Sequence, residues 1–139
     1  MPDLASRLRL DISRMARRLR QEAGASLSPS QTAALVTIER HGPLTPSELA
    51  ERERVQRPTV TRVLARLEDA GLVDRAADPQ DRRSSLLSVS DDGRALLGAA
   101  RARKDAYLAR RIDALDAADR EALERAAAIL ERMLEEGGK

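Results

Sequence analysis

Several residue types are rare or missing in this chain of 139 amino acids, and each absence excludes a class of chemistry. Cysteine is absent, which excludes disulfides, thiolate metal ligands and sensing by thiol oxidation. The single histidine, His41, excludes a metal cluster of several histidines, so the sequence predicts neither a metal site nor a cofactor. No apolar run reaches the roughly 18 residues of a membrane span. The N-terminal segment contains an arginine every few residues, whereas a signal peptide would have an apolar core there. We expect a protein of the cytoplasm with no membrane partner.

Aromatic residues are almost absent, because the chain has no phenylalanine or tryptophan and only one tyrosine, Tyr107. The core must therefore consist of aliphatic residues, methionine and alanine, a composition that favours helices. The formal net charge is only +2, and the lysine and arginine positions are all arginine except Lys104 and Lys139. Arginine matches phosphates and guanine edges, but abundant arginine and alanine are equally typical of a GC-rich genome. The positions of the arginines therefore have to decide the function.

The sequence does not predict an enzyme. Because cysteine is absent and His41 stands alone, no nucleophile is paired with a base. The glycines fall at helix ends, at a helix start or singly, so they form no phosphate-binding loop. The acidic pair Asp91 and Asp92 falls at the start of a predicted helix, where carboxylates interact favourably with the helix dipole.

Two capping boxes open the first helices of the central region. Residues 28–31 read Ser-Pro-Ser-Gln and residues 45–48 read Thr-Pro-Ser-Glu, so a hydroxyl caps the helix and the fourth residue reaches back. A third helix begins near Arg57 and has Gly71 as its C-terminal cap. One face of this third helix is an apolar stripe formed by Val60, Val63, Leu64 and Leu67.

A β-hairpin is predicted after the third helix. Leu72 and Val73 begin the first strand, residues 78–81 (Asp-Pro-Gln-Asp) form a polar turn, and residues 86–90 form the second strand. This spacing predicts a loop longer than that of the tightest hairpins. The chain is thus expected to be mainly α-helical with a small β-hairpin.

The spacing of apolar residues predicts amphipathic helices at both ends of the chain. We expect an N-terminal helix over residues 4–20, a helix over 91–113 capped by Ser90, and a last helix over 117–136 capped by Asp116. The two terminal helices have apolar stripes that include Leu4, Leu8, Ile12, Met15, Leu19, Leu123, Ala126, Ala127, Leu130 and Leu134. A second copy of the chain would cover these stripes; alternatively, the helices cover the core of a monomer.

Two capped helices, a third with a polar face and a flanking hairpin are the layout of a winged helix-turn-helix. Three segments carry a more specific signal: Arg-Pro-Thr-Val-Thr-Arg at 57–62, Asp-Pro-Gln-Asp-Arg-Arg at 78–83, and Ser-Asp-Asp-Gly-Arg at 90–94. With these segments the stretch 44–93 resembles the MarR family of transcriptional regulators.

The resemblance implies one domain over residues 1–139. In this domain a winged helix-turn-helix at 30–90 is flanked by N- and C-terminal dimerisation helices at 1–22 and 91–139. The exposed face of the third helix would read the major groove of double-stranded DNA, and a wing arginine would enter the minor groove. The DNA-binding residues implied are Gln56, Arg57, Thr59, Thr61, Arg62, Arg66, Arg82 and Arg83.

These residues are expected to have different roles. Arg62 is the residue expected to bind a guanine, because arginine to guanine is the commonest specific contact. Arg66 would hold a phosphate, and Asp81 would brace the wing through a local hydrogen bond or ion pair. Either Arg82 or Arg83 would enter the minor groove.

The resemblance also implies partners. It implies a homodimer on a pseudo-palindromic operator, located at the bacterial nucleoid in the cytoplasm, which represses transcription until a small-molecule effector releases it. In the family such effectors, often phenolic or other aromatic acids, bind between the dimerisation helices and the winged domain. Arg14, Arg17 or Arg18 would hold a carboxylate there, or they form a solvated face.

The charge balance of the central region leaves a second function possible. Residues 45–90 contain eight arginines and eight carboxylates, so this region is formally neutral. DNA binding then requires acidic side chains to point away from the duplex or to pair with arginines; the acids concerned are Glu51, Glu53, Glu68 and Asp69. The alternative is a protein–protein module on a winged-helix scaffold. A shift of a promoter fragment from the protein's own locus would distinguish the two.

Overall fold

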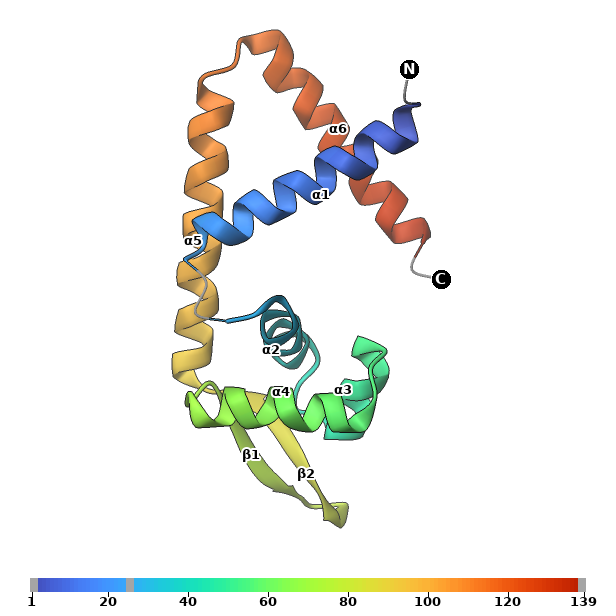
Figure 1. The fold of residues 1–139 in the computed structure, drawn as a ribbon, viewed down its shortest axis with the longest axis vertical. Helices are drawn as coiled ribbons and strands as arrows, with labels where there is room; N and C mark the ends of the chain where they lie inside the picture. Colours follow the sequence, from blue (N-terminus) through green and yellow to red (C-terminus); the bar gives the residue numbers. More distant parts are fainter. Residues whose placement is uncertain (1–2, 25–26, 138–139) are drawn as a thin grey trace.

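The computed structural model describes residues 3–24 and 27–137. Within these residues the chain forms six helices and one two-stranded antiparallel hairpin (Figure 1). The mainly α-helical fold with a β-hairpin is confirmed. The elements are α1 (Leu4–Glu22), α2 (Pro29–His41), α3 (Pro46–Glu53), α4 (Arg57–Asp69), β1 (Val73–Asp78), β2 (Asp81–Val89), α5 (Asp91–Asp113) and α6 (Ala117–Glu136).

Side-chain caps set the helix starts. At α2 the Ser28 hydroxyl accepts from the Gln31 N–H, and the Gln31 side chain accepts from the Ser28 N–H, so the predicted capping box forms in full. At α3 only half of the second box forms. The Thr45 hydroxyl accepts from the Glu48 N–H, but the Glu48 carboxylate accepts from the Thr45 hydroxyl instead of its N–H. The predicted caps of α5 and α6 are confirmed.

The core lies where α2, α3 and α4 meet the base of the hairpin and the start of α5. Leu35, Leu67 and Leu87, from three different elements, are completely buried in it. The predicted apolar stripe of α4 enters this core, with Val60, Leu64 and Leu67 buried and Val63 half-buried. Because the stripe is sealed, the opposite face of α4 is turned outward.

The hairpin differs from its prediction. The second strand begins at Asp81 instead of residue 86, and only Pro79 and Gln80 lie between the strands. The loop is therefore short, and the prediction of a longer one was wrong. Residues 81–85 lack an apolar–polar alternation because the outer half of the hairpin contacts solvent on both faces, so periodicity could not reveal them as a strand.

The helices α1, α5 and α6 form a separate arm above the core. The long helix α5 runs from the base of the hairpin to the far end of the molecule, and α1 packs against it (Figure 1). The guanidinium carbon of Arg18 on α1 lies 5.3 Å from the centre of the Tyr107 ring on α5, a cation–π contact that joins the two helices. The guanidinium carbon of Arg111, one turn along α5, lies 5.1 Å from the same centre. Tyr107 is thus largely buried and contacts two cations.

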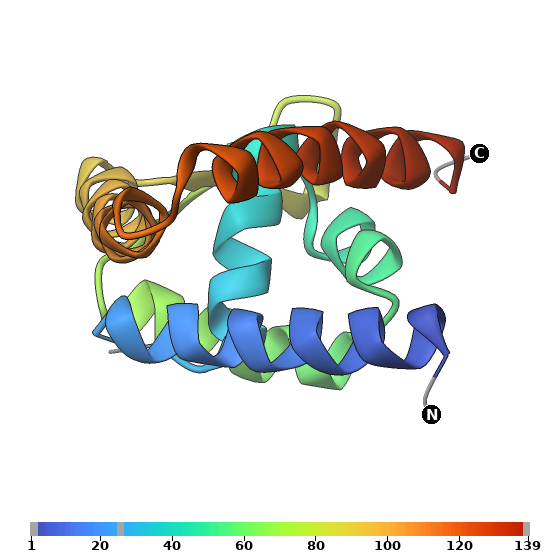
Figure 2. The same ribbon diagram turned by 90° about the horizontal axis from the view of Figure 1, so that it is seen from above.

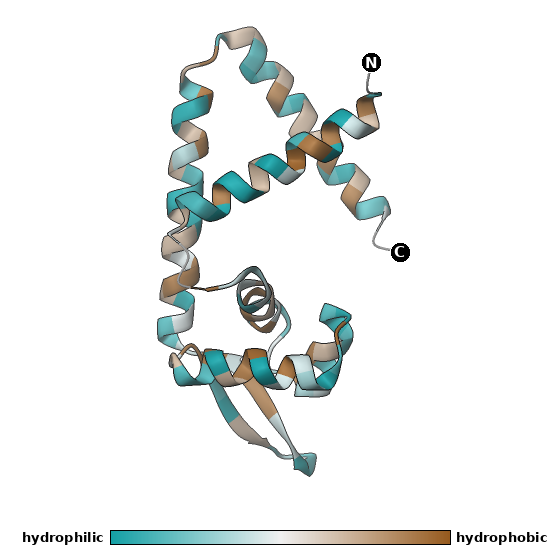
Figure 3. Ribbon diagram, in the orientation of Figure 1, coloured by the Kyte–Doolittle hydropathy of each residue, from teal (hydrophilic) through white to brown (hydrophobic). Residues whose placement is uncertain are grey.

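Helix α6 makes no extended contact with any other described element. In Figure 1 it crosses α1, but the view from above in Figure 2 shows the two helices well apart. Neither helix contains a buried residue, and the hydropathy colouring in Figure 3 shows apolar segments along both. Both helices therefore leave apolar faces uncovered within one chain. In the described part of the chain, no helix combines the length and the apolar character needed to cross a membrane.

Candidate nucleic-acid interface

The outward face of α4 is a polar and cationic surface. Thr61, Arg62 and Arg66 are exposed on it, as predicted, and the opposite side of the helix is sealed in the core. An α-helix fits the major groove of DNA when one side is free and carries short polar or cationic groups. The geometry of α4 meets this requirement.

The first residues of α4 differ in the hydrogen bonds that their side chains make. Gln56 and Arg57 are exposed, and the Gln56 side chain makes no capping hydrogen bond to the helix it precedes. Thr61 donates its hydroxyl hydrogen to the Arg57 carbonyl at 3.0 Å, so a ligand of this face would meet an acceptor oxygen and a methyl group. A threonine methyl is a suitable contact for the methyl group of thymine.

Thr59 is placed differently from the other predicted contacts. It is half-buried and lines a cavity of about 320 Å³ between α2, α3 and α4, together with Leu49, Val55 and Val63. A helix period of 3.6 residues places Thr59 about 60° around the helix from Arg62 and about 160° from Thr61, so the two threonines lie on opposite flanks of the outward face. Thr59 is therefore the least exposed of the predicted contact residues of α4.

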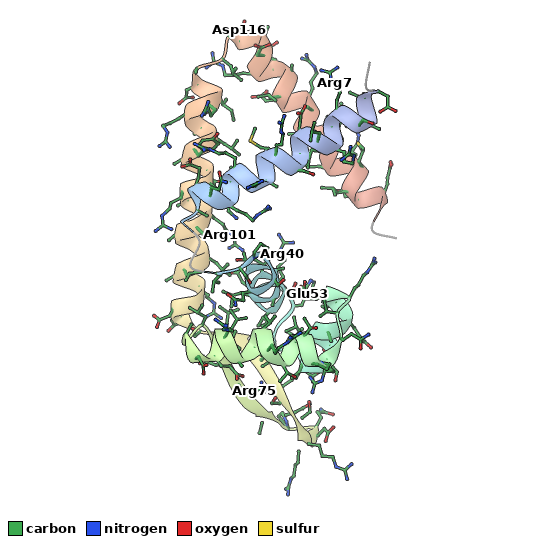
Figure 4. The ribbon with its side chains drawn as sticks, viewed as in Figure 1. Arg7, Arg40, Glu53, Arg75, Arg101 and Asp116 are labelled. Carbon is green, nitrogen blue, oxygen red and sulfur yellow. The ribbon has the colours of Figure 1, made fainter. Side chains whose placement is uncertain are left out.

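The tip of the hairpin presents two exposed guanidinium groups. Arg82 and Arg83 are exposed, and Figure 4 shows nitrogen-tipped side chains that extend from this tip away from the body. The Asp81 carboxylate accepts from the Arg83 N–H at 2.9 Å, which confirms the predicted local brace. A second local bond, from the Gln80 N–H to Asp78, holds the turn at 2.9 Å.

Four acidic side chains were expected to point away from the interface or to pair with other groups. Two of them have hydrogen-bonding partners within the chain. Glu53 accepts from the Thr37 hydroxyl on α2, and Glu68 pairs with Arg75 at 2.6 Å. Glu51 and Asp69 are exposed, and Asp69 lies at the C-terminal end of the outward face of α4. The cationic character of the surface is therefore concentrated at Arg62 and Arg66.

Sequence reasoning missed some residues at this surface. Ala65 is exposed between Thr61 and Arg62 on the outward face, where a small side chain lets the helix approach a groove closely. The same helical period that identified Arg62 and Arg66 could have identified Ala65. Arg75 and Ser85 were missed because their contact joins two strands and a helix that the sequence does not place side by side.

Comparison with known proteins identifies this arrangement. A family model described as "MarR family" matches residues 27–85. An uncharacterised HTH-type transcriptional regulator of Mycobacterium bovis is 42% identical over 134 residues, which cover 96% of this chain and 94% of the relative. The chain belongs to the MarR family. This MarR-family protein is a transcriptional regulator with a DNA-binding winged-helix fold, and it is not an enzyme.

Solved structures agree with this assignment. A putative transcriptional regulator of Pseudomonas aeruginosa superposes on the MarR-family chain with a TM-score of 0.85 at 38% identity, over 94% of this chain and 93% of the other. A mutant of S. aureus MepR bound to an oligodeoxyribonucleotide has a TM-score of 0.73 at 23% identity, and the match covers 98% and 99% of the two chains. The latter likeness shows the fold alone.

A larger cavity lies at the joint between the arm and the winged domain of this MarR-family protein. It has a volume of about 490 Å³ between the end of α1, the start of α2 and the middle of α5. Among its described lining residues four are basic and none is acidic; the basic ones are Arg17, Arg20, Arg103 and Lys104. Leu27, Leu96 and Leu97 supply apolar walls, and no aromatic ring lines the cavity.

Polar contacts join α5 to the neighbouring segments around this cavity. Arg103 donates to the Ala23 carbonyl at 2.8 Å, and Arg101 pairs with Glu39 at 2.5 Å. The hydrogen bonds to Glu39 raise the pKa of the Arg101 guanidinium above its usual value. Arg17 lines the cavity, whereas Arg18 is engaged with Glu22 and Tyr107. Among residues 3–24 and 27–137 no group of three or more His, Asp or Glu side chains is placed to hold a metal ion.

Proposed function

We propose that the protein is a homodimeric repressor that binds a pseudo-palindromic operator in double-stranded DNA. In this proposal α4 lies in the major groove, with Gln56, Arg57, Thr59, Thr61, Arg62 and Arg66 at bases and nearby phosphates, and Arg82 or Arg83 enters the minor groove. The observation that carries the proposal is the free face of α4, where Thr61, Arg62 and Arg66 are exposed together. The DNA-bound structure of MepR, a protein of the same fold, is consistent with this mode.

The uncovered apolar faces of α1 and α6 support the dimer. Leu134 is 78% exposed, Leu4 67% and Met133 57%, which is unfavourable for large apolar side chains in water. We infer that residues 1–139 act as one domain whose terminal helices intertwine with those of a second copy. Such a dimer presents two copies of α4 to half-sites about one turn of DNA apart, roughly 34–36 Å.

Repression follows from occupancy of the operator, because a dimer that covers promoter DNA excludes the polymerase from it. This activity places the protein at the bacterial nucleoid in the cytoplasm. Recovery of bound DNA fragments across the genome tests the proposal, and we expect one enriched motif with two-fold symmetry. Recovery of no enriched motif, with no shift of a promoter fragment from its own locus, would reject DNA binding in favour of a protein–protein role.

Arg62→Ala tests the role of α4 directly. We expect it to cost about 1–3 kcal/mol of operator-binding free energy and to relax the base preference at one position of each half-site. The physical reason is the loss of two parallel hydrogen bonds to a guanine edge. Fluorescence anisotropy with the operator and with single-base variants of it measures both effects.

A matched control is Arg110→Ala, which removes an exposed arginine from α5 far from the winged domain. It is expected to leave operator affinity and base preference unchanged. Equal losses for Arg62→Ala and Arg110→Ala would mean that α4 contributes only general positive charge, and the groove assignment would be wrong.

We further propose that an effector bound in the 490 Å³ cavity releases the operator. The four basic groups attract an anion, and the leucine walls favour an apolar body. Because no aromatic ring lines the cavity, an aliphatic acid has as favourable a contact as an aromatic one. The cavity joins the arm to the winged domain, so its occupancy can change the distance between the two copies of α4.

Octanoate and octylammonium are suitable probes for this cavity, because they share an apolar body and differ in the sign of the charge. At roughly ten times its Kd, octanoate is expected to raise the free energy of unfolding by about 1.4 kcal/mol. Octylammonium is expected to have no effect, and Ala100→Leu, which fills part of the cavity, should abolish the response to octanoate. Thermal unfolding measures the shift. Equal stabilisation by both probes would contradict an anion site.

A further inference from the structure

One guanidinium group connects the wing to α4. Arg75 on β1 donates from Nε to a carboxylate oxygen of Glu68, in the last turn of α4, at 2.6 Å. Its Nη1 donates to the hydroxyl of Ser85 on β2 at 2.9 Å. Figure 4 shows Arg75 below α4 at the side of the wing. A single side chain thus contacts the helix and both strands.

The wing is held firmly at its base and has few other contacts farther out. Its base is held in the core by Val73, Leu87 and Val89, and Leu87 also exchanges two backbone hydrogen bonds with Leu44. Beyond this base, residues 74–77 and 79–83 are exposed, and the pairing of the strands is irregular between Ala77 and Asp78. An isolated two-stranded hairpin is only marginally stable in water. The direction of the outer wing therefore depends on its base and on Arg75.

We infer that Arg75 is a positioning residue that fixes the wing tip relative to α4, so that helix and wing engage one duplex together. The inference rests on the proposed function of both elements in DNA binding. Arg75 also neutralises Glu68, whose carboxylate would otherwise repel nearby phosphates. The side chains of Arg75 and Glu68 are 43% and 32% exposed, and pairs this exposed add little to folding stability. The consequence of losing the pair is therefore a change in DNA binding and wing order, with the fold retained.

Lysine cannot replace arginine in this role. The guanidinium holds Glu68 and Ser85 at once through two nitrogens in a rigid plane, whereas an ammonium group is a single point of contact. Arg75→Lys therefore keeps the charge and loses the geometry, and Arg75→Gln loses both. Arg101→Gln is the matched control, because it breaks the Glu39 pair, which is similarly exposed and lies on the other side of the core.

The first measurement reports wing order without DNA. Because the chain has no cysteine, spin labels can be attached cleanly at Gln80→Cys in the turn and Ala65→Cys on α4. When the labelled chain is diluted into excess unlabelled protein, so that a dimer holds one labelled copy, we expect one narrow distance distribution in the parent and in Arg101→Gln, and a broader one in Arg75→Gln and Arg75→Lys. An unchanged distribution in Arg75→Gln would overturn the inference.

The second measurement is a double-mutant cycle on operator binding. Arg75→Gln is expected to weaken binding about tenfold in the parent, and by less than about twofold when Arg82→Ala and Arg83→Ala are already present. A positioning residue loses its effect when the groups that it positions are gone. An equal loss in both backgrounds, or no loss in the parent, would overturn the inference, because Arg75 would then act on its own or not at all.

The two measurements separate the inference from the proposed function. If the parent protein fails to bind any operator but Arg75→Gln broadens the label distances, the proposed function is wrong and the structural role of Arg75 stands. If the operator binds and the tip arginines contribute nothing to affinity, the wing has no contact to position, and the inference is overturned while the role of α4 remains.

Discussion

Aspartate at Leu123 and Leu134 is expected to convert the dimer into monomers and to lower operator affinity by roughly 100- to 10,000-fold. Both side chains lie on the uncovered apolar face of α6, where they are 47% and 78% exposed in one chain. In a dimer each aspartate would be a buried charge without a partner, which strongly destabilises an interface. A monomer has one α4 and loses the gain that comes from binding two linked half-sites.

Sedimentation measures the first effect as a change from about twice 15.2 kDa to 15.2 kDa, and anisotropy measures the second. Ala118→Asp with Ala128→Asp is the matched control, because both alanines are exposed on the opposite side of α6 and the added charge is the same. The control is expected to remain a dimer with unchanged affinity. A variant at Leu123 and Leu134 that stays dimeric would show that α6 is not at the interface.

The second large effect is expected from Gly93→Ala at the junction of wing and arm. A Cβ atom at Gly93 would lie 2.4 Å from the Leu72 carbonyl oxygen and 2.6 Å from a methyl carbon of Val89. The Gly93 N–H also donates to the Ser90 hydroxyl, which in turn donates to the Gly71 carbonyl at 2.6 Å. The end of α4, the base of the wing and the start of α5 therefore meet at one crowded point.

Because a backbone oxygen cannot move aside cheaply, Gly93→Ala is expected to lower the free energy of unfolding by about 3 kcal/mol. Gly98→Ala is the control in the same helix: a Cβ there meets nothing within 4 Å. It is expected to raise stability by up to about 1 kcal/mol, because alanine favours the helix more than glycine does. Urea titration measures both changes. A Gly93→Ala variant at least as stable as the parent would show that space at Gly93 does not limit the fold.

Much of the fold was predictable because its determinants are close together in the sequence. A capping hydrogen bond joins residues three apart, as between Ser28 and Gln31, so the residue types alone reveal it. The sealed face of α4 follows from apolar residues at helical spacing, and the free face with Arg62 and Arg66 follows as its complement. The same reasoning gave both terminal helices to within two residues.

Other features needed the tertiary structure. The early start of β2 depends on pairing with β1, since the polar residues 81–85 show no alternation of their own. The half-buried position of Thr59 depends on where α2 and α3 lie, and the cavity depends on three helices that meet from separate parts of the chain.

Helix starts, the apolar faces of the helices and the charged residues that stay outside can be read from the amino-acid sequence, because each of these is set by neighbours within about one or two turns. The contact of Arg75 with Glu68 and Ser85, and the uncovered position of α6 within one chain, become visible only in the folded chain. The physical reason is that these properties depend on the packing of elements far apart in sequence, which local hydrogen bonding and periodicity do not specify.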